Sequence, residues 1–387
     1  MNLEQKCLDE LGTISRGKSK HRPRNDPSLF DGKYPFIQTA DVKNANFYIT
    51  EYSQTYNEKG LAQSKLWKKG TLCITIAANI ADTGILGIDA CFPDSIMGFV
   101  PYEDKSDVRY VKYCFDILQK QCQQISQGAT QDNLSWEKLS TIKFPVPPID
   151  AQKQIADILS AYDDLIENNQ KQIKLLEEAA QRLYKEWFVD LRFPGHENTP
   201  ITDGIPQGWK EGTIQDIVVY HDKKRKPLSG MQRAEMQGKY RYYGAASILD
   251  YVNNYLFDGT YLLLGEDGTV ITQDGYPILQ YVTGKFWANN HAHVLTGKPD
   301  YPTEYLYMMF KATKVKDIVT GVAQPKISQA RLSNKKTIIP NKEIVRDFCS
   351  IVSPMFKQIL SLEDQIELSK EARDRLLPKL MSGELEV

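Results

Sequence analysis

The histidines with the most suggestive spacing are His291 and His293, in the stretch FWANNHAHVL. In a β-strand this alternation would point both imidazoles to one face, as a metal site requires. The sequence offers no third ligand close by. We therefore expect no metal at this pair and assign it to packing in a core or a groove.

Other short motifs that resemble catalytic loops lack essential parts. The stretch LLLGEDGTV, residues 262–270, has neither the third glycine nor the following helix of a dinucleotide-binding loop, so we expect a β-turn with Asp267-Gly268 at its tip. The Pro147-Pro148 pair is flanked by valine and isoleucine, whereas the Asn-Pro-Pro-aromatic loop of amino-methyltransferases needs a polar residue before and an aromatic after. The chain also has no P-loop, GxSxG or HExxH motif. We predict no catalytic site and no metal.

Basic residues are concentrated in two places. A run of four consecutive cations and a looser run near the N-terminus are related by a shift of 206 residues, which matches Lys18 with Lys224 and Lys20 with Lys226. A single charge run is usually a solvated loop, but recurrence favours contacts with DNA phosphates. The predicted phosphate-binding residues are Arg16, Lys18, Lys20, Arg22 and Arg24 in the first run and Lys223, Lys224, Arg225 and Lys226 in the second.

Polar and aromatic residues near these runs could read base edges. An Asn amide, for example, can pair bidentately with adenine. The candidates are Gln38, Thr39 and Asp41 in the first half, and Tyr242, Tyr243, Ser247, Asn289 and Asn290 in the second.

These residues recur because the chain contains an internal repeat. A constant shift of 193 places residues 128–184 on 321–377 without a gap, with 17 of 57 positions identical, including Gly128 on Gly321 and Gln131 on Gln324. Gly32-Lys33-Tyr34 matches Gly238-Lys239-Tyr240 at the shift of 206, so the second copy is about a dozen residues shorter in between. A period this long indicates two similar domains, a shape that suits a target read in two separated halves.

Each copy ends in a heptad helix that follows a proline-rich extended segment. We expect Asp150 and Asn341 to act as N-caps, and the first helix to run from Ala151 to Phe188, about 57 Å at ~1.5 Å per residue. The apolar stripe of one rod can be buried against the other, and the symmetry of the repeat makes that pairing antiparallel. The pairing residues predicted are Leu159, Ile166, Ile173, Leu176, Leu183, Ile359, Leu362, Ile366 and Leu376.

Composition limits the alternatives. The net charge of −1 means that a nucleic-acid role must rest on local basic patches or on partner subunits. Six cysteines without a CxxC pair favour reduced thiols in a cytoplasmic protein, and we find neither a signal peptide nor a membrane span.

The predicted fold class is α+β. Two similar domains with curved β-sheets, residues 1–148 and 209–340, are separated by two long antiparallel coiled-coil helices, residues 149–188 and 341–387, with pseudo-two-fold symmetry. Residues 189–208 form a linker.

Several stretches in both copies of the repeat resemble a known protein family. The stretch from QGATQDNLSWEKL through FPVPPIDAQKQIADIL to RLYKEWF, followed by GIPQGWKEGTIQDI, is similar to the central region of specificity subunits of type I restriction-modification systems. TGVAQPKIS to RLLPKLMSGEL resembles their C-terminal repeat, and GKYPFIQTADV and YYGAASILDYVNNYLFDGTYLLLGEDG resemble two kinds of target-recognition domain. One departure is that the first copy lacks the Gly-Trp-Lys that opens the second at 208–210, which leaves its first strand unassigned.

The resemblance implies a non-catalytic subunit that reads a bipartite double-stranded DNA target, with the helices as a spacer. It further implies two methyltransferase subunits that bind S-adenosylmethionine and methylate adenine, and two ATP-driven, Mg-dependent restriction subunits, with no cofactor on this chain. The alternatives are a self-sufficient DNA methyltransferase or nuclease with an unrecognised site, and a structural adaptor, which the paired basic runs disfavour.

Overall fold

The computed structural model describes residues 3–77, 81–126, 139–321 and 323–387, so Gly128 and Gln131 of the repeat lie outside the described residues. By its internal contacts the chain divides into two units. Unit 1 comprises Met1–Lys171 and Glu363–Val387, and unit 2 comprises Gln172–Leu362. The boundary passes through both long helices, so each unit contains one part of each helix.

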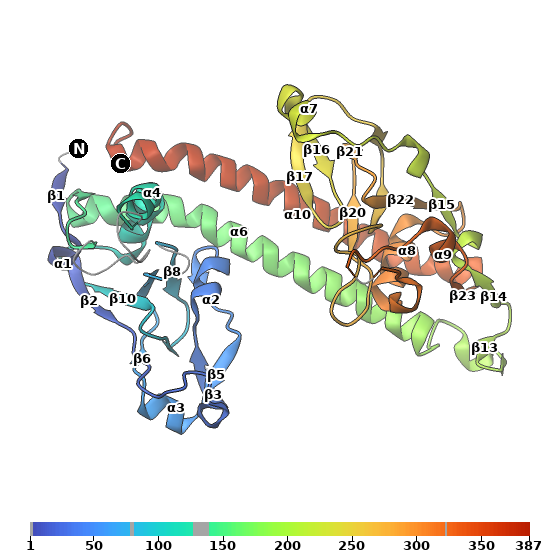
Figure 1. Ribbon diagram of the computed structural model, residues 1–387, viewed down its shortest axis with the longest axis horizontal. Helices are drawn as coiled ribbons and strands as arrows, with labels where there is room; N and C mark the ends of the chain where they lie inside the picture. Colours follow the sequence, from blue (N-terminus) through green and yellow to red (C-terminus); the bar gives the residue numbers. More distant parts are fainter. Residues whose placement is uncertain (1–2, 78–80, 127–138, 322) are drawn as a thin grey trace. The chain divides into compact units, whose positions relative to one another are not determined.

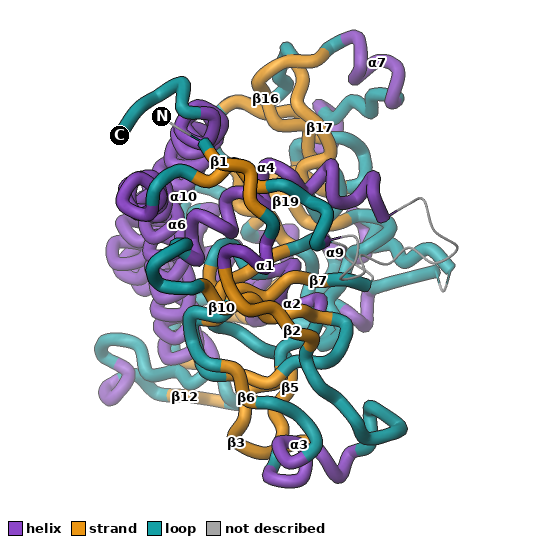
Figure 2. Tube along the Cα trace, turned by 90° about the vertical axis from the view of Figure 1, so that its left-hand side faces the viewer, coloured by secondary structure: helices purple, strands orange, loops and turns teal. Residues whose placement is uncertain are grey.

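Unit 1 is built from two sheets and a strand pair. The five-stranded sheet has the order β2-β10-β7-β8-β4, with bounds Gly12–Arg16, Ile96–Pro101, Leu72–Thr75, Thr83–Leu86 and Tyr48–Ile49. The four-stranded sheet has the order β5-β3-β9-β6, with bounds Gln54–Tyr56, Phe30–Phe36, Ala90–Cys91 and Leu66–Trp67. Its helices are α1 (Leu8–Leu11), α2 (Thr39–Asn44), α3 (Glu58–Ala62) and α4 (Val108–Ser126). Both views place β3, β5 and β6 at the end of the unit remote from β1 (Figure 1 and Figure 2).

Unit 2 repeats the arrangement of two sheets and a strand pair, but its first sheet has four strands instead of five. Its sheets have the orders β15-β22-β19-β20 (Val218–Tyr220, Ala292–Gly297, Tyr261–Gly265, Leu279–Val282) and β17-β16-β21-β18 (Ile248–Val252, Gln237–Tyr243, Lys285–Ala288, Phe257–Asp258). In each unit the second sheet contains one parallel pair, β3 with β9 and β16 with β21. The helices are α7 (Gly230–Glu235), α8 (Thr303–Ala312) and α9 (Gln329–Ser333), and a small hairpin joins β12 (Ile201–Thr202) to β13 (Ile205–Pro206). The predicted α+β class is confirmed.

The difference in length between the copies has one main location. Between β3 and β5 the first copy inserts α2 and β4 in residues 37–53, whereas β16 and β17 are joined directly by residues 244–247. This insertion supplies the fifth strand of the unit 1 sheet, where β4 pairs in parallel with β8.

The repeated Gly-Lys-Tyr marks a bulge at the same place in each unit. The pairing of β3 with β5 shifts between Phe30 and Tyr34, and that of β16 with β17 shifts between Gln237 and Tyr240. A Cβ added to Gly32 would lie 2.3 Å from the Cα of Asn57, and one added to Gly238 would lie 2.3 Å from the Cα of Asn253. Only glycine tolerates such a close approach of two backbones, so this repeated motif serves the fold.

The first strand of unit 1, which the sequence left unassigned, is present. Strand β1 (Glu4–Lys6) pairs antiparallel with β11 (Phe144–Val146), with Glu4 opposite Val146. In unit 2, β14 (Lys210–Thr213) pairs with β23 (Lys336–Ile339), with Lys210 opposite Ile339. The two pairings correspond residue by residue under the shifts of 206 and 193, so the repeat extends to the first strand of each copy.

The long helices are α6 (Ile149–Tyr184), which continues through a π-helical turn at Lys185–Val189, and α10 (Lys342–Ser382). Asn341 caps α10 as expected, since its Oδ1 accepts a hydrogen bond from the Glu343 amide over 2.9 Å. The N-cap predicted at Asp150 is wrong, because α6 begins at Ile149 and Asp150 therefore lies within its first turn.

The two helices run antiparallel, as predicted. Within unit 1, Asp163 of α6 pairs with Arg373 of α10, and Asn169 donates to Gln365, so the partner number falls as the α6 number rises. Within unit 2, the ring of Tyr184 contacts that of Phe348. The predicted pairing residues are buried at Leu159, Ile166, Ile359, Leu362 and Ile366, and half-buried at Ile173, Leu176, Leu183 and Leu376.

The helices are part of the cores of the domains. In unit 1, Leu72, Ile74 and Phe99 of the five-stranded sheet belong to one buried cluster with Phe115 of α4, Leu159 of α6 and Leu380 of α10. In unit 2, Leu262 and Leu295 of the first sheet share a cluster with Leu306 of α8, Ala180 of α6 and Phe348 of α10. Because apolar burial contributes roughly 25 cal/mol per Å², each helix end is held by its domain as well as by its partner helix.

Within the described part of the chain, no helix is long and apolar enough to cross a membrane. The five cysteines whose side chains are described are free thiols, and burial raises the pKa of Cys73 and of Cys114 well above the usual range.

Candidate nucleic-acid interface

The first basic run leaves the end of β2 as a loop whose backbone is firmly held. The amide of Gly17 donates to the Ile96 carbonyl and that of Lys18 to the Phe92 carbonyl, while the Ser64 hydroxyl donates to the Lys18 carbonyl over 2.7 Å. The side chains of Arg16, Lys18 and Lys20 are exposed and make no ion pair with any described residue. They are therefore available to an anionic ligand, Arg16 at the end of β2 and the two lysines on a loop that is already ordered.

The two arginines at the end of this run are engaged with the protein. Arg24 donates from Nη2 to both carboxylate oxygens of Asp94, at 2.6 and 2.8 Å. Arg22 donates from Nη1 to the carbonyl oxygens of Ser19 and His21, and its Nη2 lies 3.8 Å from Asp94. Both remain half-exposed, and the single carboxylate of Asp94 compensates one of their two charges.

The second basic run follows β15, the counterpart of β2. Lys223, Lys224 and Lys226 are exposed and, like their counterparts in unit 1, have no ion-pair partner among the described residues. The backbone at Lys226 is fixed, because its carbonyl accepts a hydrogen bond from the Trp287 indole over 2.6 Å. The same arrangement of exposed cations on a held loop thus occurs after the equivalent strand in both units.

Arg225 differs from its three neighbours because it points into the protein. Its Nη1 donates to Glu266 over 2.7 Å and to the Ala292 carbonyl over 2.6 Å, and its Nε donates to the Asp222 carbonyl. With its hydrogen bonds used internally, Arg225 anchors the loop that presents the lysines, and we remove it from the predicted phosphate contacts.

His293 lies beneath this loop and is almost completely buried, with 1% of its surface exposed. Its Nδ1 is 2.6 Å from Asp222 Oδ2 and its Nε2 is 2.8 Å from the Ile327 carbonyl oxygen. Burial by itself would raise the pKa of Asp222, but the hydrogen bond and charge of His293, with the Val294 amide and Arg225, lower it below the usual range.

The two histidines of the HxH pair do not share a ligand. His291 is half-exposed and hydrogen-bonds Asp267, whereas His293 bonds Asp222. Asp222, Glu266 and His293 do lie within 4.8 Å of one another, but Arg225 and Lys326 already occupy the carboxylates. These two cations balance the negative charges of Asp222 and Glu266. We therefore interpret the group as a structural hydrogen-bond network and assign no metal to it.

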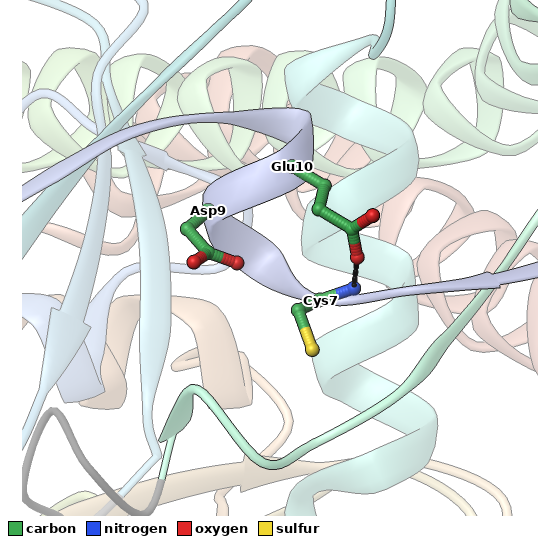
Figure 3. A group of neighbouring side chains, drawn as sticks. All are labelled: Cys7, Asp9 and Glu10. Atoms are coloured by element: carbon green, nitrogen blue, oxygen red, sulfur yellow. Dashed lines mark hydrogen bonds between the residues drawn. The ribbon is translucent and has the colours of Figure 1, made fainter.

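A second group that could in principle hold a metal is formed by Cys7, Asp9 and Glu10 (Figure 3). The Glu10 carboxylate accepts a hydrogen bond from the Cys7 backbone amide over 2.6 Å. This is how an acidic residue caps the first turn of a helix, here α1, so the contact accounts for Glu10 without a metal.

The candidate base readers divide into exposed and buried side chains. Ser247 and Asn290 are exposed, and Gln38, Thr39 and Asp41 are half-buried at the start of α2. Asp41 caps that helix through the Gln38 amide, and Gln38 itself donates to Gln54 over 2.6 Å. These five can still reach a ligand by their exposed atoms.

Three of the candidates cannot reach a ligand in this structure. Tyr242 is 1% exposed and its hydroxyl accepts from the Leu228 amide, Tyr243 is buried in the second sheet, and Asn289 is 3% exposed and accepts from the His291 amide. We revise the prediction for these three, because Tyr242 and Tyr243 are buried in different apolar clusters on the two faces of β16, and Asn289 is buried directly after β21.

Comparison with known proteins decides the family. The family model for the type I restriction modification DNA specificity domain matches residues 2–178 and 206–369, which is most of the chain and both copies of the repeat. The chain belongs to this family of specificity subunits. It is the DNA target specificity subunit of a type I restriction-modification system, the non-catalytic component of that complex.

Relatives agree over the full length. The MjaIX specificity subunit of Methanocaldococcus jannaschii is 28% identical over 99% of this chain and 93% of its own. The HindI specificity subunit of Haemophilus influenzae is 22% identical over 97% of this chain and 98% of its own. The crystal structure of the type I S subunit from M. genitalium matches with a TM-score of 0.63 at 16% identity, covering 98% of this chain and 96% of that one, which shows a shared fold. Specificity subunits of this family typically bind no cofactor themselves and assemble into a complex with DNA.

Proposed function

We propose that the two units of this specificity subunit each read one half of a bipartite DNA target, with the paired helices α6 and α10 setting the spacing. The observation that carries the proposal is the recurrence of exposed, unpaired cations on a held loop after β2 and after β15. Two such loops would bind phosphates in two places and fix the register of each unit on the duplex.

The roles follow from exposure. Phosphate contacts are assigned to Arg16, Lys18 and Lys20 in unit 1 and to Lys223, Lys224 and Lys226 in unit 2. Base contacts are assigned to Gln38, Thr39, Asp41, Ser247 and Asn290. For exchange experiments we keep the boundaries 1–148 and 209–340 for the recognition domains, 149–188 and 341–387 for the spacer helices, and 189–208 for the linker.

The partners proposed are two methyltransferase subunits, which bind S-adenosylmethionine and methylate adenine, and two restriction subunits, which use ATP and Mg. Support for a pair of like partners comes from exposed apolar side chains at matching positions of the two helices. Ile158 matches Ile351 and Leu175 matches Leu368 under the shift of 193, and each is identical in both copies and exposed. Such side chains on water-facing helices are suited to burial by another protein. The complex is expected in the cytoplasm, with the DNA that it modifies.

The test is to express the full chain with its methyltransferase partner and map methylated adenines genome-wide. We expect a single split motif, and no methylation by the purified chain alone. Replacement of residues 209–340 by another such domain should alter one half of the motif and leave the other unchanged. Methylation or cleavage by the isolated chain would instead support the self-sufficient enzyme and overturn the proposal.

A further inference from the structure

A third basic segment, in unit 2, is not accounted for by the predicted loops. Between Lys311 and Lys336 the chain carries one acid, Asp317, and seven cations: Lys311, Lys314, Lys316, Lys326, Arg331, Lys335 and Lys336. In a chain of net charge −1 this is a marked local excess. The cations are separated in sequence, so a search for consecutive basic residues does not find them.

Part of this segment surrounds an open recess. The recess has a volume of about 510 Å³, and its lining includes Arg331, Asn334, Lys335, Lys336 and Asp317. The lining comes from the 3-10 turn Lys316–Ile318 and from the segment that runs from α9 to the start of β23, and this segment is held in place. Ser328 caps α9 through the Arg331 amide, and the Ile214 amide donates to the Lys335 carbonyl over 3.0 Å.

The charges of the recess do not cancel. Lys335 donates to both carboxylate oxygens of Asp317, at 2.8 and 2.9 Å, and this contact lowers the pKa of Asp317. Arg331 and Lys336 are exposed and have no ion-pair partner in the described part of the chain. The recess therefore keeps two uncompensated positive charges, together with the polar Asn334 side chain.

This basic segment adjoins the Lys223–Lys226 loop. Glu266 accepts from Arg225 of that loop over 2.7 Å, and its other oxygen lies 3.3 Å from Lys326 of the segment. The two groups of cations therefore meet at one carboxylate, and a single polyanion could contact both. A DNA backbone is such a polyanion, and a guanidinium fork with a neighbouring ammonium suits its phosphates.

We propose that the recess lined by Arg331, Lys335 and Lys336 is a further binding site for DNA backbone phosphate, which extends the phosphate contacts of unit 2. This inference rests on the proposed function. Under the shift of 193 the two uncompensated cations Arg331 and Lys336 have basic counterparts, Lys138 and Lys143, whereas Lys335 is replaced by Ile142, which is buried.

The experiment measures the salt dependence of binding of the full chain to a fluorescently labelled duplex of arbitrary sequence. Each phosphate contact contributes about 0.9 to the slope of log K against log salt. The variant R331Q/K336Q is expected to lower the slope by about 2. The control K370Q/R375Q removes the same charge from α10, where these cations already pair with Glu367 and Glu371, and is expected to leave the slope unchanged. Circular dichroism should show that each variant is folded.

The variant K223Q/K224Q separates this inference from the proposed function. If it lowers the slope while R331Q/K336Q does not, the recess is no phosphate site and the reading function stands. If neither variant lowers it, both the recess and the proposed loops are rejected. If R331Q/K336Q leaves DNA binding intact but weakens binding of the methyltransferase subunit, the recess serves an acidic protein surface and the inference is overturned.

Discussion

Arg373 of α10 donates from Nη1 to Asp163 Oδ1 of α6 over 2.5 Å, although the two residues are 210 positions apart in the chain. The other Asp163 oxygen accepts from the Tyr113 hydroxyl of α4. Asp163 is 2% exposed, and burial together with the charge of Asp163 raises the pKa of Tyr113, so the phenol remains a donor. One buried carboxylate therefore ties three helices of unit 1 together. At the matching positions of the other copy stand Phe356 and Ala180, both buried in one apolar cluster.

Replacing Asp163 by Ala should destabilise the protein by about 3 kcal/mol, because Arg373 is left partly buried without its partner. This is the lower end of the usual range, since a quarter of the Arg373 side chain is exposed. The double variant D163F/R373A copies the pair found in unit 2 and should lose less than the sum of the losses in the single variants D163F and R373A. Urea unfolding of D163A, of these two single variants and of the double variant measures the differences. Additive losses would show that the two residues are not coupled.

Replacing His293 by Gln should destabilise unit 2 in a pH-dependent way. Because His293 and its neighbours lower the pKa of Asp222, the stability they contribute is present above the unfolded-state pKa of about 3.9 and is lost as pH falls through the lower folded-state pKa. We expect H293Q to cost about 2 kcal/mol at pH 7, since a buried carboxylate loses its partner, and the cost to shrink towards pH 3. Chemical unfolding at several pH values measures this. H291Q serves as the control, because His291 is half-exposed, and an equal loss at every pH would contradict the prediction.

The long helices could be predicted from sequence because their signal is local. A heptad pattern needs only the residues of the helix itself, and the expected range 151–188 agrees with α6 and the π-helical turn that follows it. The Gly-Lys-Tyr repeat could be found but not interpreted, because the reason for the glycine is the backbone of Asn57 or Asn253, which lies elsewhere in the chain.

The exposure of individual site residues could not be predicted from sequence, because it depends on distant partners. Four consecutive cations at 223–226 look equivalent, yet Arg225 turns inward to reach Glu266 and Ala292, 41 and 67 residues later. Asn289 was proposed as a base reader on its residue type, whereas its side chain accepts from an amide two residues ahead. The residue type indicates which contacts with DNA a side chain could make. The folded sheet determines which of these side chains are exposed and can make them.

Within the first basic run, the unpaired lysines should matter more for DNA binding than the paired arginines. K18Q/K20Q should lower the slope of log K against log salt by about 2, while R22Q/R24Q, which removes the same charge, should lower it by less because the Asp94 carboxylate compensates one of those two arginines. Fluorescence anisotropy over a range of salt concentrations measures both slopes. If the arginine variant had the larger effect, phosphate would have to displace Asp94, and the assignment of roles in this loop would be reversed.

The exposed leucines of the helices should control assembly with the methyltransferase subunits. Leu175 is 64% exposed and Leu368 is 65% exposed, so replacing them by Gln should leave the free energy of unfolding almost unchanged. If each leucine is covered by one methyltransferase subunit, L175Q and L368Q should each weaken the binding of one subunit about tenfold, since losing a buried leucine costs roughly 1.5 kcal/mol or more. The double variant should weaken both. Analytical ultracentrifugation of the mixed subunits distinguishes complexes with one and two methyltransferases.

Lys153, exposed on α6, provides the control variant K153Q, which should assemble normally. Full assembly of the double leucine variant at the wild-type affinity would rule out these side chains as the docking positions.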